Sequence, residues 1–437
     1  MRNTIRNRTC LSGLIALLLL IIQSGCGPDQ PVVVAPGELL KSALPRDLQP
    51  NVPDADLAAL VSGNNDFCCA LYQQIAGGTD NIICSPYSVS LALAMTYAGA
   101  RGTTATEMAQ ALQFMLPSER LHPAFNKLDL ALMSRGQGAQ GREGSGFTLR
   151  IANSLWGEKT MPFENAFIDL LGVNYGAGMR VVDFINQPEE CRLGINAWVE
   201  DQTNDKIKDL LAQGSIDNMT RLVLANAVYF DAMWKDTFER EDTRIQRFCL
   251  AGGDSTAVNM MHQVAYMKCA ESDSWQALEM PYDGNEMSMV VLLPRTNAGL
   301  ASLENALTAG MIDTIIGQMA DTPVVLSLPK YEFTSGSISL VGPMEALGMH
   351  DAFSSIADFS GIDGQQDLSI SDIIQKAFVA VDEKGTTAAA ATAVTIGTTS
   401  IQIPDNPIYF TADHPFLFFI RDIATGQIVF IGKVMKP

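Results

Sequence analysis

Residues 381–404 read VDEKGTTAAAATAVTIGTTSIQIP, a composition that fits neither an ordinary core strand nor an ordinary loop. No charged residue occurs from Gly385 to Pro404, although three ionic residues come directly before Gly385. The alanines at 388–391 favour a helix, whereas the surrounding β-branched residues favour an extended chain, because branching at Cβ restricts a side chain in a helical turn. Composition alone leaves two interpretations open. The segment is either a buried helix or strand, or a loop in one state and a central strand in another.

The flanking sequences favour the second interpretation because they match a known family. Residues 376–396 read KAFVAVDEKGTTAAAATAVTI, residues 410–422 read FTADHPFLFFIRD, and residues 432–437 read GKVMKP. Together they resemble the serpin family of serine protease inhibitors, and the resemblance covers about residues 57–437. It implies an α+β serpin fold with three β-sheets, about nine helices and an exposed reactive-centre loop at about 383–404.

In serpins the start of that loop is a hinge, which moves into a large sheet after a protease has cleaved the loop. The resemblance assigns the hinge to Glu383, Gly385, Thr386, Thr387, Ala388, Ala389, Ala390 and Ala391. Small side chains suit such a hinge because a bulky or charged group would clash, or be buried without a partner, between two strands. The family's usual loop length places the cleaved bond between Thr399 and Ser400, with the bonds at Thr398 and after Ser400 as the nearest alternatives.

The resemblance also assigns residues to two regions of the main sheet that part when the loop enters. The shutter residues are Ser85, Pro86, Ser88, Asn226 and Gln375, and the breach residues are Trp234 and Lys330. Structural roles fit some of them as well, since a serine before a proline is a typical helix start and a buried Asn or Trp is common in cores. Gln375 stands where the family has a histidine. Its amide can form hydrogen bonds but cannot act as a proton switch near neutral pH.

Two expectations concern the hinge in the uncleaved protein. Lys330 should pair with Glu383 at an exposed site, where such a pair stabilises by about 0 to 1 kcal/mol. Thr386 should lie outside the sheet and turn inward, with every second residue after it, as the loop inserts. We therefore expect Thr386→Arg to convert an inhibitor into a substrate while changing the native fold little.

The N-terminal residues predict export. Three arginines precede the apolar run 14–22, which is too short to cross a bilayer comfortably, and small residues with a cysteine follow. Residues 1–25 are therefore predicted to be a signal peptide, and Cys26 a bacterial-type lipoprotein processing site that anchors the protein to the cell envelope. Gln23 replaces the leucine usual at such a site, so secretion to the extracellular space without lipid is the alternative.

Proline content suggests where the folded domain begins. Residues 26–56 contain six prolines, a density that resists helix and sheet and predicts an extended tether. Apolar residues at helical spacing begin near Leu57. The predicted organisation is thus a signal peptide at 1–25, a proline-rich tether at 26–56 and a serpin domain at 57–437.

Charge and cysteine usage exclude several partners. Removing residues 1–25 takes away three arginines and no acids, which leaves 26 basic against 48 acidic residues and a net charge near −22. Binding to nucleic acid or heparin is therefore not expected, and the predicted helix at 121–133 has no basic face. The eight cysteines show no metal-ligand spacing and are expected to be mostly free buried thiols. No metal, no cofactor and a monomer are expected.

An enzyme is not expected either. The sequence contains no GxSxG, HExxH or P-loop pattern. A GxGxxG match occurs at Gly136, Gly138 and Gly141, but no strand leads into it and no helix follows it, so it predicts a flexible loop. The four histidines stand apart in different contexts.

The resemblance implies a suicide inhibitor that forms a covalent complex with its target protease. The protease attacks a loop carbonyl, and the loop inserts before water can hydrolyse the acyl-enzyme. Because Thr399 is small and uncharged, an extracellular serine protease with a shallow elastase-like or subtilisin-like pocket is favoured. A papain-like cysteine protease remains an alternative target. A noninhibitory serpin that acts as a binding or structural protein is disfavoured, because residues 386–393 include no bulky, charged or proline residue.

Overall fold

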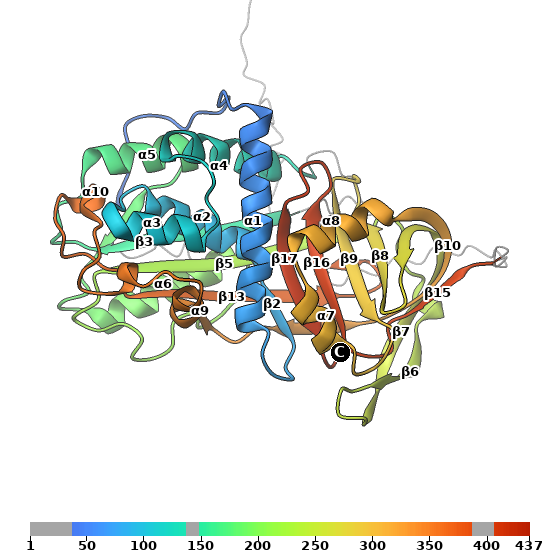
Figure 1. Cartoon of the computed structure of the whole chain (residues 1–437). Helices are drawn as coiled ribbons and strands as arrows, with labels where there is room; N and C mark the ends of the chain where they lie inside the picture. The colour runs from blue at the N-terminus through green and yellow to red at the C-terminus, as the bar shows by residue number, and fades with distance from the viewer. Residues whose placement is uncertain (1–36, 137–147, 387–405) are drawn as a thin grey trace, which may run out of the picture. The chain divides into compact units, whose positions relative to one another are not determined.

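The computed structural model describes residues 37–136, 148–386 and 406–437 (Figure 1). The chain divides into two compact units, Met1–Val34 and Ala35–Pro437, and all described residues belong to the second. The α-helices of the described residues are α1 (Asp54–Ile75), α2 (Pro86–Tyr97), α3 (Gly102–Ala111), α4 (Ser118–Met133), α5 (Asn165–Tyr175), α6 (Pro188–Gln202), α7 (Leu300–Ala306), α8 (Ala309–Gln318), α9 (Val341–Ala346) and α10 (Ser360–Asp363). Two short 3₁₀ helices lie at Arg240–Asp242 and Asp351–Phe353.

The strands of the described residues form two sheets. They are β1 (Glu38–Leu40), β2 (Ile82–Cys84), β3 (Thr148–Glu158), β4 (Met179–Val182), β5 (Leu222–Met233), β6 (Arg244–Cys249), β7 (Ser255–Glu271), β8 (Trp275–Pro281), β9 (Met287–Pro294), β10 (Ala320–Pro329), β11 (Tyr331–Thr334), β12 (Ile338–Ser339), β13 (Asp372–Val381), β14 (Gly385–Thr386), β15 (Ile408–Thr411), β16 (Phe416–Asp422) and β17 (Ile428–Val434).

The first sheet, called the main sheet below, has eight strands in the order β1-β4-β3-β5-β14-β13-β11, with β12 paired to β13. The second has nine strands in the order β15-β10-β7-β8-β9-β16-β17-β2, with β6 paired to β7. Three sheets were expected. Hydrogen bonds join the described strands into two because the 17-residue β7 pairs with β6 near its start, with β10 along most of its length and with β8 at its end.

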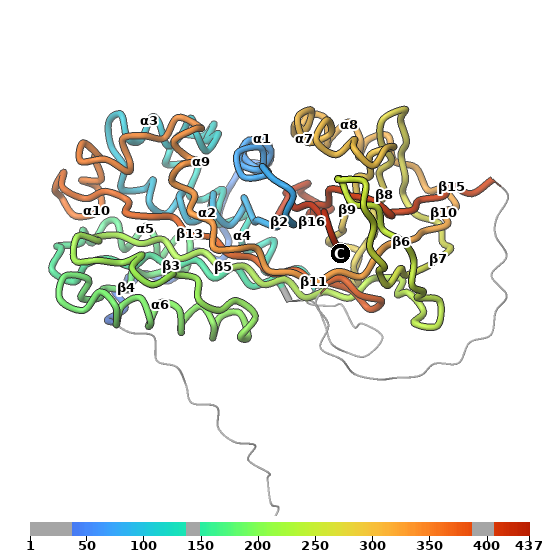
Figure 2. The backbone as a smooth tube through the Cα atoms, turned by 90° about the horizontal axis from the view of Figure 1, so that it is seen from below, coloured from blue at the N-terminus to red at the C-terminus, as the bar shows by residue number. Residues whose placement is uncertain are grey.

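The two faces of the main sheet are covered by different helices, as Figure 2 shows. Along β5, Leu224, Val228 and Phe230 face the large core that includes α2, whereas the odd-numbered Val223 and Ala225 pack with residues of α6. This alternation follows from the two-residue period of a strand. A third cluster joins α1, α7 and α8 to β9, β16 and β17. Strand β5 is therefore buried on both faces over most of its length, and a strand that joins it there must carry mainly small or apolar side chains.

The folded body begins earlier than the proline content predicts, so the proposed tether at 26–56 is wrong for its described part. Strand β1 extends the edge of the main sheet by pairing antiparallel with β4. Arg46 then donates from Nε to Asn126 Oδ1 at 2.8 Å and pairs with Asp129 at 2.6 Å, both on α4. The prolines at 45, 50 and 53 are compatible with this packing, because residues 41–53 form neither helix nor strand and a missing backbone N–H costs little there. Residues 26–36 and the predicted signal peptide lie outside the described residues.

The described cysteines match the expectation of mostly free, buried thiols. Each of the six described cysteines is free, and all except Cys249 are buried. Within the described ranges, no cluster of His, Cys, Asp and Glu has the geometry of a metal site. The same ranges contain no helix of sufficient length and apolarity to span a bilayer.

Candidate functional site

The hinge enters the main sheet between β5 and β13. After β13 the chain turns at residues 382–384, and the short strand β14 pairs antiparallel with both neighbours, Thr386 lying opposite Val381 and Ala232. The Asp382 carboxylate accepts hydrogen bonds from the backbone nitrogens of Lys384 and Gly385 at 2.8 and 3.2 Å, which closes the turn. A Cβ on Gly385 would lie 2.1 Å from the Ala232 carbonyl oxygen. Glycine is therefore required because the backbones approach so closely.

Thr386 is inside the protein, which corrects the expectation that it lies outside the sheet before cleavage. Only 1% of its surface is exposed, and its Oγ1 lies 2.8 Å from the Tyr282 hydroxyl. An arginine at this position would be buried in the uncleaved protein as well, where an unpaired charge is strongly destabilising. The expectation that Thr386→Arg changes the native fold little is therefore wrong.

Trp234, the predicted breach residue, packs directly beneath the hinge turn. Its Nε1 donates to the Asp382 carbonyl oxygen at 3.0 Å, and its backbone nitrogen donates to the Lys384 carbonyl oxygen at 2.8 Å. The indole ring stacks on Tyr282 with a centroid distance of 4.7 Å and an interplanar angle of 10°. Trp234 thus connects the turn before the hinge to an aromatic side chain of the second sheet.

The expected ion pair between Lys330 and Glu383 is confirmed, with Nζ 2.6 Å from Oε2. The Glu383 side chain is only 6% exposed, however, so the expectation of an exposed site is wrong for this partner. Burial opposes ionisation of Glu383, but hydrogen bonds from Lys330, from backbone and from Thr243 outweigh it and lower its pKa. The carboxylate is therefore held in its charged form at the start of the hinge.

Further along the sheet, β5 and β13 pair directly, in parallel, from Asp372 opposite Val223 to Ala377 opposite Val228. The shutter residues gather under this seam. Ser85 caps α2 by accepting from the backbone nitrogen of Ser88, with Pro86 in the first turn. The Asn226 amide donates to Ser88 Oγ at 2.6 Å. A strand can enter here only if this direct pairing and the polar contacts beneath it separate.

Gln375 and Asn153 complete the shutter. The Gln375 amide accepts from the Ser85 backbone nitrogen at 3.1 Å and donates to the Ser85 carbonyl oxygen at 3.0 Å, so it uses both of its polar atoms. Asn153 on β3 accepts from Ser88 and Asn226 and donates to the Ser88 carbonyl oxygen. The sequence prediction missed Asn153. Its position opposite Asn226 in the antiparallel register was the signal that could have identified it.

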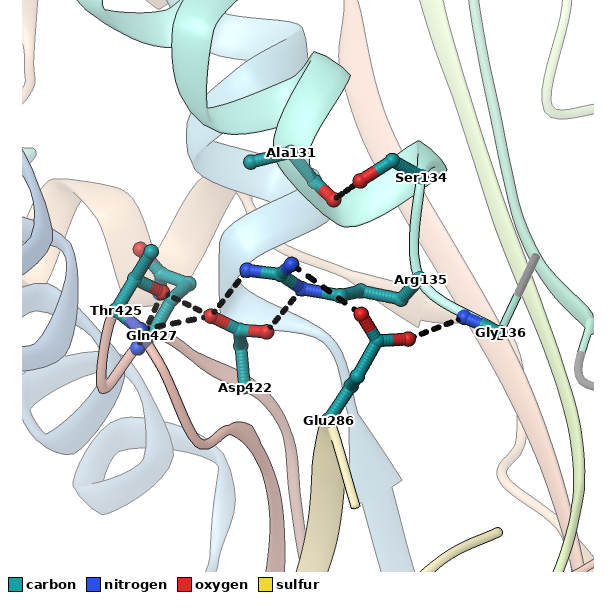
Figure 3. Close-up of polar contacts among 8 residues, drawn as sticks. All are labelled: Ala131, Ser134, Arg135, Gly136, Glu286, Asp422, Thr425 and Gln427. Carbon is teal, nitrogen blue, oxygen red and sulfur yellow. Dashed lines mark hydrogen bonds and ion pairs between the residues drawn. The ribbon is translucent and has the colours of Figure 1, made fainter. Parts of the chain in front are cut away.

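The turn between β8 and β9, residues 282–286, is anchored by a partly buried ionic cluster (Figure 3). Arg135, just after α4, donates from Nε to Asp422 Oδ1 at 2.7 Å and lies 3.5 Å from Glu286. Asp422 also accepts from the backbone nitrogen and hydroxyl of Thr425 at 2.8 and 2.6 Å. Glu286 accepts from the Gly136 backbone nitrogen at 2.7 Å. Gly136, the first glycine of the GxGxxG match, therefore has a structural contact. Gly138 and Gly141 lie outside the described residues.

Several predicted site residues cannot be placed. Thr387, Ala388, Ala389, Ala390 and Ala391 of the hinge, the reactive bond Thr399–Ser400 and the predicted lipidation site Cys26 lie outside the described residues. The structure does place the start of the hinge, Gly385–Thr386, next to the breach residue Trp234. The shutter residues lie further along, on or beneath the same two strands, β5 and β13.

Sequence and structure comparisons match this arrangement. The family model described as serpin (serine protease inhibitor) matches residues 62–437. A serpin-like protein of Thermococcus kodakarensis is 37% identical over 432 residues, covering 97% of this chain and 98% of that protein. The leukocyte elastase inhibitor of Homo sapiens is 40% identical over 395 residues, covering 86% of this chain and 99% of its own.

Solved structures agree with the sequence relatives. The native state of the thermophilic serpin tengpin has a TM-score of 0.78 at 29% identity, covering 91% of this chain and 98% of tengpin. Uncleaved ovalbumin has a TM-score of 0.77 at 27% identity, covering 87% of this chain and 100% of its own. With its α+β fold, its hinge between β5 and β13 and these matches, the chain belongs to the serpin family.

Proposed function

We propose that this serpin is a suicide inhibitor of an extracellular serine protease with an elastase-like or subtilisin-like pocket. The single observation that carries the proposal is the strand Gly385–Thr386, which lies between two strands that pair directly with each other further along. The loop therefore starts where β5 and β13 are already apart, and it can continue between them if their direct pairing separates. Relatives named as leukocyte elastase inhibitors support a target with a small specificity pocket.

The mechanism requires the chain to store free energy in its uncleaved form. The protease serine attacks the carbonyl of Thr399, the bond to Ser400 breaks, and the freed loop inserts while the acyl-enzyme persists. About 15 inserted residues would form a strand of about 50 Å at ~3.3 Å per residue. The inserted strand satisfies backbone groups on β5 and β13, and the carried protease is displaced by the same distance. This protein itself needs no cofactor for these steps, since the covalent chemistry belongs to the protease.

A protease panel tests the proposal. The purified protein is incubated with pancreatic elastase, subtilisin and papain, and the products are separated on a denaturing gel. A covalent complex with elastase or subtilisin is expected, and protein cleaved without complex should melt at a higher temperature than the intact form. Complex with papain alone would contradict the serine protease assignment. Cleavage by all three enzymes without complex, and without a rise in melting temperature, would indicate a noninhibitory member.

We propose further that the protein is exported and held at the cell envelope through lipid on Cys26. The support is the sequence alone, an apolar run that follows three arginines and precedes a cysteine. Twelve residue steps separate Cys26 from Glu38, so this part of the chain reaches at most about 40 Å. Mass spectrometry of the N-terminal peptide tests the assignment. An unmodified N-terminus in a secreted protein would contradict it.

A further inference from the structure

Tyr282 reaches the hinge from the other sheet. It follows β8 in the turn that leads to β9 and is fully buried. Its hydroxyl lies 2.8 Å from Thr386 Oγ1, and the structure shows no other hydrogen bond from the Thr386 side chain to a described residue. Thr386, whose side chain is the first of the loop to lie within the main sheet, therefore depends on a residue outside that sheet for its polar contact.

The Tyr282 ring is held in place on several sides. It stacks on Trp234, and Phe230 approaches it edge-on with a centroid distance of 5.0 Å. Its backbone nitrogen donates to the Met287 carbonyl oxygen, and the next nitrogen, of Asp283, donates to the Met233 carbonyl oxygen, both at 2.9 Å. A hydroxyl fixed in this way loses little conformational freedom when it binds Thr386.

We propose that Tyr282 is a positioning residue for loop insertion, because its hydroxyl holds Thr386 between β5 and β13 before cleavage. This inference rests on the proposed inhibitory function. Insertion competes with hydrolysis of the acyl-enzyme. A loop whose first residues already lie between β5 and β13 has fewer residues left to insert, which favours insertion over hydrolysis. One net hydrogen bond shifts an equilibrium between engaged and released hinge about fivefold, and an orphaned buried hydroxyl shifts it further.

Four variants separate positioning from general packing. Tyr282→Phe keeps the ring but leaves the Thr386 hydroxyl unpaired, and Thr386→Val leaves the Tyr282 hydroxyl unpaired. The double variant has neither hydroxyl and leaves no polar group orphaned. Tyr331→Phe is the control, because among described residues that buried hydroxyl has only a weak hydrogen bond, to the Met289 sulfur at 3.8 Å.

The first measurement is the number of inhibitor molecules consumed per elastase molecule trapped. This stoichiometry should rise about threefold or more in each single variant of the pair. It should return toward the wild-type value in the double variant and stay unchanged in Tyr331→Phe. A purely structural role for Tyr282 predicts no such rescue by valine. An unchanged stoichiometry in Tyr282→Phe, or a double variant as impaired as the single ones, would overturn the inference.

The second measurement does not depend on inhibition. Hydrogen exchange of the peptide containing residues 382–386, followed by mass spectrometry, should be slow in the wild type and faster in Tyr282→Phe, and slow again in the double variant. This pattern supports the positioning role even if the wild-type protein traps none of the proteases, a result that would count against the proposed function alone. Equal exchange in all variants would overturn the inference whatever the inhibition assay gives.

Discussion

The amide nitrogen of Gln375 donates to the side-chain oxygen of Asn226 across 2.7 Å, and the two residues lie directly opposite each other on β13 and β5. Both side chains are almost completely buried. The contact therefore joins the two strands that separate in the proposed insertion of the loop. It also shows how glutamine fills a position where the family has histidine, with every polar atom paired and no titrating group.

Gln375→Leu should lower the free energy of unfolding by several kcal/mol. Leucine has a similar size, but it orphans the buried backbone nitrogen of Ser85 and the Asn226 oxygen, and each unpaired group costs about 1–3 kcal/mol. Gln375→His is the matched control because imidazole retains a donor and an acceptor. Urea unfolding at pH 8 measures both. Equal stability of the leucine variant and the wild type would show that this contact does not hold the seam together.

Ala390→Arg should convert the inhibitor into a substrate. By strand alternation from Thr386, residue 390 turns toward the large core as the loop inserts, whereas residue 389 turns to the other face. The inward arginine would be buried without a partner and slow insertion. Ala389→Arg carries the same charge one residue away and is the control, because the register of β14 on β5 places residue 389 opposite Tyr229, beside the partly exposed Asp231. The ratio of covalent complex to cleaved product with elastase should fall about tenfold or more only for Ala390→Arg. Equal loss in both variants would disprove the proposed register.

Arg135→Met should destabilise the native protein by about 2–5 kcal/mol, because Asp422 is fully buried and would lose its cation. Methionine keeps most of the apolar stem of arginine. Arg150→Met on β3 is the control, since Arg150 is exposed and its side chain forms a 3.4 Å hydrogen bond to Asn204 but no ion pair with a described residue. Thermal melts of both variants measure the difference. Similar small shifts in both melts would mean that the ionic cluster contributes nothing.

Arg46→Ala tests whether the N-terminal segment is part of the folded body. Arg46 opposes the effect of burial, which raises the pKa of Asp129. Its removal leaves a buried carboxylate and the Asn126 oxygen without a partner, at a cost of about 1–3 kcal/mol. Lys41→Ala, on the exposed surface of the same segment, is the control. Limited proteolysis at residues 37–53 should accelerate in Arg46→Ala only. A segment cut equally fast in the wild type would contradict the packing described above.

His122 should make stability fall in mild acid. Burial lowers its pKa to about 4, against about 6.5 in an unfolded chain. The unfolded state therefore binds the proton first, so stability is unaffected above pH 6.5 and declines by about 3 kcal/mol as the pH falls to 4. His122→Gln removes the titrating group and keeps a partner for the hydroxyls of Tyr175 and Ser118. Urea midpoints between pH 7 and pH 4 should fall less for the variant. Parallel curves would disprove the assignment.

Local sequence patterns predicted much of the site. The small residues after Gly385 and the Ser85-Pro86 helix start each have a local physical reason, whereas Asn226 and Trp234 were identified through the family resemblance. Asn153, Tyr282 and Arg135 carry no such local signal. Each acquires its role from a partner more than 50 residues away in the sequence.

The sequence by itself determined the family, the run of small hinge residues and the absence of a proton switch at Gln375, because these depend on which side chains are present in which order. Only the tertiary structure decided that Thr386 is already engaged, that Glu383 is buried and that residues 37–53 belong to the body. Those outcomes depend on free-energy differences between long-range contacts, such as the hydroxyl pair with Tyr282 and the pairing of β1 with β4. Composition and spacing do not contain such contacts, because the residues that form them meet only when the chain has folded.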